Sequence, residues 1–127
     1  MTQVTLFVCS LCRFSLEEKS RDGVSGGEYF IEQLQAEMVH RNLQDTVHIK
    51  SVQCMAACSH PCNVMLAAPG KLTFVFSGLP PAKSAKILSE FCQKYTSCPD
   101  GRVPYRERSP AIHQVTAFIL PPLPPVL

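Results

Sequence analysis

The chain has 127 residues, which is enough for one domain with a single core and too few for two. Hydrophobic residues make up 46% and charged residues 17%, as in globular proteins, and no apolar run is long enough to span a bilayer, so we expect a soluble protein. The formal net charge is +2, with both signs scattered along the chain, which leaves no basic footprint for nucleic acid or an anionic membrane.

Seven cysteines are many for a chain of this length. The residues after Met1 lack the basic leader and the cleavage site of a secretory signal, so we expect the cytoplasm. Disulfides are rare there because thiols are kept reduced. The cysteines therefore predict metal ligation or thiol chemistry.

The first strand is predicted at residues 3–8, a short apolar and β-branched run that ends directly on Cys9. Residues 10–26 are polar and broken by glycines. A connection of this length in a compact domain is usually functional.

A helix follows, because Ser25 and Glu28 have the spacing of a capping box and apolar residues then recur at helical intervals through about Asn42. Residues 47–53 alternate as a second strand and end on Cys54. Each of these two strands thus leads into a group of cysteines.

Two further strands, at residues 63–67 and 71–76, are predicted to form a hairpin around a Pro-Gly turn. A second helix is expected to open at Pro80 and Pro81, since proline is tolerated in a first turn. Its apolar stripe consists of Ala85, Leu88, Phe91, Cys92 and Tyr95. The order β-α-β-β-β-α predicts the α/β class with a mixed four-stranded sheet.

Beyond residue 98 the pattern gives way to a proline-rich segment. We therefore divide the chain into a domain at residues 1–98 and an extended tail at residues 99–127, expected to run as polyproline II. Such a tail packs on its own domain or on a second subunit, or binds an aromatic groove of a partner. We favour the first two.

The cysteines near the strand ends are candidate metal ligands. They form two groups, Cys9 with Cys12, and Cys54 with Cys58 and Cys62. A β-α-β unit makes its two strands parallel, so their C-terminal ends meet at one sheet edge and the two groups become one site. Gaps of two or three residues let paired thiolates bind one centre, either zinc or an iron-sulfur cluster.

Two other cysteines and one histidine are expected to have roles other than metal ligation. Cys92 lies on a helix stripe and Cys98 just past it, as expected of small buried residues. His60, beside Cys58, is expected to be a solvated loop side chain or a hydrogen-bond donor to the site rather than a ligand.

This element order, with one cysteine after the first strand and Cys-x3-Cys after the second, resembles the thioredoxin-like 2Fe-2S ferredoxins. The resemblance implies a thioredoxin-like sandwich, a cluster held by four thiolates, electron transfer with a redox partner protein, and often a homodimer. Cys9, Cys54 and Cys58 match three ligand positions. The ferredoxins carry their second cysteine much further from the first, so Cys12 is chosen as the fourth ligand, with Cys62 as its substitute.

Nearly the whole chain also resembles an uncharacterised bacterial family of predicted metal-binding proteins. The segments that carry this likeness are Cys9-Ser-Leu-Cys12-Arg-Phe, Val52-Gln-Cys-Met-Ala-Ala-Cys58, Gly70-Lys-Leu-Thr-Phe-Val-Phe76 and Pro99-Asp-Gly101. This second resemblance implies metal binding.

The sequence thus predicts a metal-binding protein, with a 2Fe-2S cluster and electron transfer as the first hypothesis and a zinc-binding module as the alternative. A thiol oxidoreductase using Cys9 and Cys12 is a third, although the helix start lies more than ten residues beyond Cys12, whereas the CxxC of a thioredoxin opens a helix that lowers the thiol pKa. The sequence carries no other enzymatic motif.

Overall fold

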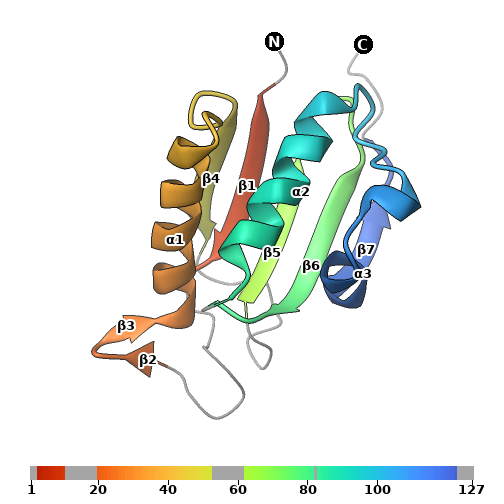
Figure 1. Cartoon of the computed structure of the whole chain (residues 1–127). Helices are drawn as coiled ribbons and strands as arrows, with labels where there is room; N and C mark the ends of the chain where they lie inside the picture. Colours follow the sequence, from red (N-terminus) through yellow and green to blue (C-terminus); the bar gives the residue numbers. More distant parts are fainter. Residues whose placement is uncertain (1–2, 11–19, 53–61, 82, 123–127) are drawn as a thin grey trace.

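The computed structural model describes residues 3–10, 20–52, 62–81 and 83–122 (Figure 1). These residues form strands, α-helices and one short 3-10 helix. In chain order they are β1 (Val4–Cys9), β2 (Ser20–Arg21), β3 (Val24–Ser25), α1 (Gly26–His40), β4 (Val47–Val52), β5 (Cys62–Ala67), β6 (Thr73–Leu79), α2 (Ala85–Ser97), η1 (Tyr105–Glu107), α3 (Pro110–Val115) and β7 (Thr116–Leu120).

One mixed sheet organises the fold, with strand order β4-β1-β5-β6-β7. β1 and β4 are parallel, and every other neighbouring pair in this sheet is antiparallel. The α/β class and the mixed sheet are confirmed, but the expected count of four strands is wrong. The fifth strand is β7, whose apolar residues pair with β6.

Helices α1 and α2 lie side by side on one face of the sheet (Figure 1). Strands β1 and β6 show why, because their residues alternate between buried and half-buried. The buried set of β1 and β6 points to the helices and forms the core with α1 and α2. Its large members include Leu6, Phe74, Phe76, Phe30 and Leu34.

The two long helices begin differently. Ser25 caps α1, its hydroxyl accepting from the Glu28 backbone N–H at 3.1 Å, as the capping-box spacing predicted. α2 begins at Ala85, later than the two prolines suggested, and Ser84 is its N-cap. The predicted apolar stripe of α2 is confirmed, since Leu88, Phe91 and Tyr95 are buried.

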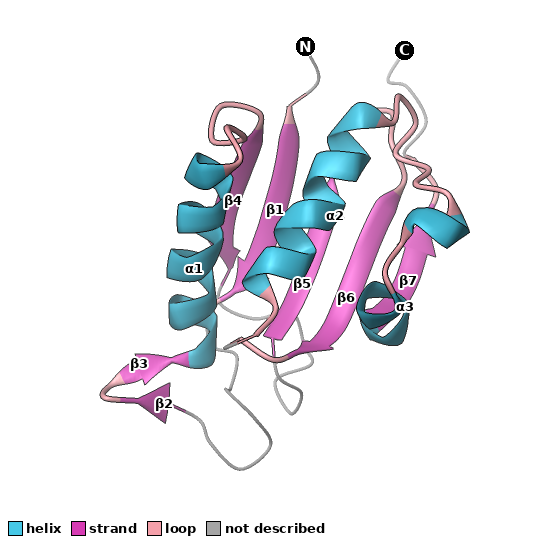
Figure 2. Ribbon diagram, in the orientation of Figure 1, coloured by secondary structure: helices cyan, strands magenta, loops and turns pink. Residues whose placement is uncertain are grey.

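A small hairpin of β2 and β3 precedes α1 (Figure 2). Its turn requires positive φ at Asp22 (50°) and Gly23 (79°), conformations that Asp and Gly tolerate best. The hairpin lies within the segment expected to be a long polar loop.

The C-terminal segment, expected to be extended, contains η1, α3 and β7 in its described part. Pro110 occupies the first turn of α3, and Ser109 caps the helix. Val103 and Ile112 are buried in the same core as the sheet and α2. The division of the chain into a domain at residues 1–98 and a tail at residues 99–127 stays a prediction. Among the helices described, none is long and apolar enough to cross a membrane.

Candidate metal centre

Three strand ends meet at one edge of the sheet. Cys9, the last residue of β1, pairs with Val52, the last residue of parallel β4. β5 runs antiparallel to β1, with Val64 opposite Val8, so β5 begins at this edge with Cys62. The predicted convergence of the two cysteine-bearing strand ends is confirmed for the described residues, and Figure 1 shows the strand ends together at the lower edge of the sheet.

Two of the five proposed ligands, Cys9 and Cys62, lie in the described part of the structure. Cys9 is fully buried, and Cys62 pairs through its backbone with Leu79 of β6. Cys12, Cys54 and Cys58 lie outside the described residues, as does His60. Within the described ranges no three His, Cys, Asp or Glu side chains gather as a metal site. The ligand set therefore stays a prediction, as does the choice between Cys12 and Cys62.

Ser10 anchors the chain where it leaves β1. Its backbone N–H donates to the Val52 carbonyl at 2.8 Å, and its hydroxyl donates to the same oxygen at 3.2 Å. Its own carbonyl accepts from the Ser25 hydroxyl at 2.5 Å. Ser10 thus ties together the ends of β1 and β4 and the start of α1, three elements that are distant in the sequence.

The N-terminus of α1 packs directly against this edge. A Cβ added at Gly27 would overlap the Cys9 carbonyl oxygen and come within 2.7 Å of the Ser10 carbonyl carbon. Only glycine allows the helix to approach the strand so closely. Because a helix N-terminus carries about half a positive charge, it favours negative charge, such as a thiolate, at the end of β1.

A hydrogen-bonded polar pair with one buried member lies at the same edge. Asn63, the second residue of β5, is 3% exposed, and its side-chain oxygen accepts from the Ser77 hydroxyl of β6 at 2.7 Å. A hydrogen bond of this kind offsets the cost of burying the amide and joins β5 to β6 beside Cys62. No spacing signal in the sequence indicates this pair, so it could not be predicted.

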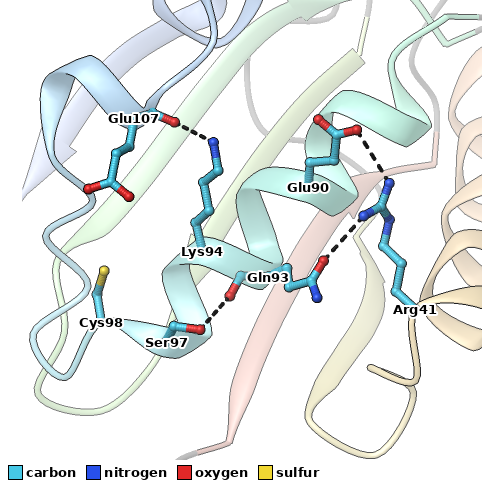
Figure 3. Close-up of a pocket in the computed structure, with 7 residues that line it drawn as sticks. All are labelled: Arg41, Glu90, Gln93, Lys94, Ser97, Cys98 and Glu107. Carbon is cyan, nitrogen blue, oxygen red and sulfur yellow. Dashed lines mark hydrogen bonds and ion pairs between the residues drawn. The ribbon is translucent and has the colours of Figure 1, made fainter.

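The remaining two cysteines lie elsewhere. Cys92 is fully buried in α2, and burial raises the pKa of its thiol to about 12, which keeps it protonated and inert. Cys98 follows α2 and lines an open pocket of about 490 Å³ together with Arg41, Glu90 and Lys94 (Figure 3). Neither Cys92 nor Cys98 forms a disulfide. Cys98 follows the C-terminal end of α2, which lies at the opposite end of the sheet from the C-terminal ends of β1 and β4 (Figure 1).

Comparison with known proteins places the chain in a family. The family described as "Protein of unknown function (DUF1636)" matches residues 6–122. The chain belongs to this family. No curated protein matches its sequence.

Two solved structures share the fold of this family member. One is the wild-type thioredoxin-like 2Fe-2S ferredoxin from Aquifex aeolicus, with a TM-score of 0.57, 16% identity, and coverage of 93% of this chain and 99% of that chain. Another structure of a thioredoxin-like 2Fe-2S ferredoxin from Aquifex aeolicus has a TM-score of 0.50, 13% identity, and coverage of 94% of each chain. The thioredoxin-like fold is therefore confirmed, and these neighbours are the ferredoxins that the sequence resembles.

Proposed function

We propose that the chain binds a 2Fe-2S cluster through four cysteines and carries electrons. The observation that carries this proposal is the pairing of Cys9 with Val52, because it brings the end of β1 within a few residues of Cys54 along the chain. The fold that the chain shares with the Aquifex ferredoxins supports the same cofactor.

The donor set fits the cluster. Thiolates are the ligands that 2Fe-2S clusters take, and the proposed ligands are Cys9, Cys54 and Cys58, with Cys12 as the fourth and Cys62 as its substitute. When bound, the cluster supplies one-electron transfer. A partner protein delivers or accepts that electron, and the cytoplasm is the proposed compartment because thiols remain reduced there.

Hydrogen bonds within the protein fix the strand ends that lead to the proposed ligands. Ser10 ties the end of β1 to Val52 and, through Ser25, to α1. These bonds fix where the chain leaves two strands on its way to Cys12 and Cys54. The N-terminus of α1 packs against the backbone at the end of β1, and a helix N-terminus favours negative charge nearby, as thiolate ligands would carry.

Zinc is the alternative occupant, because four thiolates also suit tetrahedral zinc. The thiol oxidoreductase hypothesis stays a third candidate, because the first turn of α1 packs against the backbone carbonyl of Cys9 and so brings a helix N-terminus to the end of β1. The helix starts far from Cys12 in sequence but packs against the end of β1 in space. The three functions therefore differ in the bound group, and an experiment that identifies it separates them.

The test is an ultraviolet-visible spectrum of anaerobically purified protein before and after dithionite, with iron, zinc and sulfide assayed on the same sample. We expect visible bands that bleach on reduction, with equal iron and sulfide. Cys54→Ser and Cys58→Ser should each lose the metal, while Cys98→Ser, which changes a cysteine far from this edge, should keep it.

Each other result points to one alternative. A colourless protein with stoichiometric zinc would replace the cluster by the zinc module. Protein without metal that reduces disulfides, and loses this activity in Cys9→Ser, would establish the oxidoreductase. Full metal content in both Cys54→Ser and Cys58→Ser would overturn metal binding at this edge.

A further inference from the structure

Cys9 and Asn63 lie opposite one another in the sheet. β1 and β5 are antiparallel, with Val8 paired to Val64, and the same register sets the next residue of β1, Cys9, opposite Asn63. Both belong to their strands, Cys9 as the last residue of β1 and Asn63 as the second residue of β5. Residues directly opposite in antiparallel strands have Cβ atoms about 4.5–5.5 Å apart, which is within reach of an amide and a thiol.

The two side chains also share one face of the sheet. Side chains alternate along a strand, and the neighbouring Val8 and Val64 belong to the core that the helices cover. Cys9 and Asn63, one position further along, therefore lie on the other face. Both are buried, at 0% and 3% exposed. Polar groups buried in this way find their hydrogen-bond partners within the protein.

Ser77 holds the Asn63 amide in one orientation. Its hydroxyl, on β6, donates to the side-chain oxygen of Asn63 at 2.7 Å. Because β5 lies between β1 and β6, Asn63 has Ser77 on one side and Cys9 on the other. The oxygen and the NH2 group of an amide point in diverging directions. With the oxygen turned to β6, the NH2 group is turned toward β1 and Cys9.

An irregularity in β6 falls at the same place. The register of β5 with β6 shifts between Cys62 and Val64, so that Ser77 and Gly78 of β6 together lie opposite Asn63. Gly78 has a φ of +81°, a conformation that glycine adopts readily. Bulges of this kind re-aim side chains and are frequent beside functional sites. The bulge thus contains the residue that holds the amide.

We propose that Asn63 is a positioning residue that donates an amide N–H to the sulfur of Cys9 when the metal centre is bound. The inference rests on the proposed function, in which Cys9 is a ligand. Hydrogen bonds to the sulfurs of an iron-sulfur cluster tune its reduction potential. A donor at this sulfur stabilises the reduced cluster, which is the more negative form, and so raises the potential. Ser77 contributes by orienting Asn63.

The test is a redox titration, followed by visible absorption, of the anaerobically purified protein with its cluster bound. Asn63→Leu keeps the approximate shape of the side chain but has no N–H to donate, so its reduction potential should lie below that of wild type. Ser77→Val and Ser77→Thr form a matched pair, because the two new side chains have the same shape and only threonine has a hydroxyl. Ser77→Val should lower the potential by less than Asn63→Leu does, and Ser77→Thr should keep the wild-type potential.

Two further variants distinguish this role from a structural one. In the Asn63→Leu background, Ser77→Val should shift the potential no further, because Ser77 acts only through the amide. Ser89→Ala is the control, since it removes another buried hydrogen bond, to the Ala85 carbonyl of α2 at 2.7 Å. It should lower stability in urea unfolding and leave the potential unchanged.

The outcomes separate this role from the proposed function. A wild-type potential in cluster-bound Asn63→Leu, or equal potentials in Ser77→Val and Ser77→Thr, would overturn the role of Asn63 and leave the proposed function standing. Wild-type protein without a cluster would overturn the proposed function and this role with it. If Asn63→Leu does not hold a cluster, the comparison of Ser77→Val with Ser77→Thr decides.

Discussion

Gly27, in the first turn of α1, lies against the carbonyl oxygen of Cys9 with no room for a side chain between them. An added Cβ would also come within 2.7 and 2.8 Å of two backbone carbons of Ser10. Backbone atoms cannot move aside as a flexible side chain can. The position of α1 over the end of β1 therefore depends on a missing side chain.

Replacing Gly27 with Ala should move α1 away from the end of β1. Inserting atoms into such a packed contact costs about 1–3 kcal/mol, which urea unfolding would measure as a lower midpoint. Because the same contact positions the flank of the candidate metal centre, we also expect a lower iron or zinc content per chain.

Gly70→Ala is the control for this substitution. Gly70 has a φ of +73° and nothing within 4 Å of an added Cβ, so Ala there meets backbone strain of about 1–2 kcal/mol without a steric clash. Its metal content should equal that of wild type. Equal metal content in Gly27→Ala would show that the approach of α1 does not matter to the site.

Ser25→Ala tests the link between α1 and the end of β1. The hydroxyl caps α1 and donates to the Ser10 carbonyl at 2.5 Å, so its loss should cost about 1 kcal/mol for the cap alone and should also lower the metal content. Ser109→Ala removes the equivalent cap of α3, whose hydroxyl accepts from Ile112 N–H at 3.3 Å. A similar loss of stability with full metal content is expected there, and metal loss in both variants would argue against a specific link.

Lys71 stabilises the C-terminal end of α2. It is 4% exposed, its ammonium donates to the carbonyls of Tyr95 (3.1 Å) and Thr96 (3.4 Å), and burial lowers its pKa. Lys71→Met should cost about 1.5–3 kcal/mol, because charged hydrogen bonds to buried carbonyls are lost. Lys94, which donates to the Glu107 carbonyl from an exposed position, is the control, and Lys94→Met should cost clearly less. If urea unfolding shows the same loss of stability in Lys71→Met and Lys94→Met, Lys71 does not have this role.

Much of the site's framework could be predicted from the sequence. The apolar run before Cys9, the capping box at Ser25 and the alternating strand before Cys54 are local signals, and the parallel pairing of the two strands follows from the single helix that connects them. The thioredoxin-like fold follows from the order of these elements. The hydrogen bonds of Ser10 with Val52 and Ser25 could not be predicted from the sequence. Each of them links residues that are distant along the chain and that only the fold brings together.

The errors in the prediction have the same origin. Strand β7 is not predicted because the prolines around it give this segment the composition of an extended tail. In the structure the five residues Thr116–Leu120 pair with β6. The hairpin of β2 and β3 is too short to show a periodic pattern. A buried lysine such as Lys71 carries no local signal either, because only the end of α2 supplies its acceptors.

Cys92 makes stability depend on alkaline pH. Its thiol has a pKa of about 12 in the folded chain against 9.0 as the ordinary value, so above pH 9 the unfolded chain releases a proton that the folded chain keeps. The folded state then binds more protons, and the free energy of unfolding falls as pH rises toward 12, by up to about 1.4 kcal/mol per pH unit. Tyr95 acts in the same direction from pH 10, because burial raises its pKa to about 12.

Between pH 9 and 10 the Cys92 thiol contributes more to this pH dependence than Tyr95 does, because its ordinary pKa is lower. In Cys92→Ala the free energy of unfolding should therefore fall less steeply with pH in this range. Urea unfolding at several pH values measures that slope. Ser89→Ala is the control, because Ser89 is equally buried in α2 and donates to the Ala85 carbonyl at 2.7 Å, but carries no proton that titrates in this range. It should be less stable than wild type with an unchanged slope. A wild-type slope in Cys92→Ala would mean that the thiol is ionised in the folded chain, and would contradict its place in the dry core.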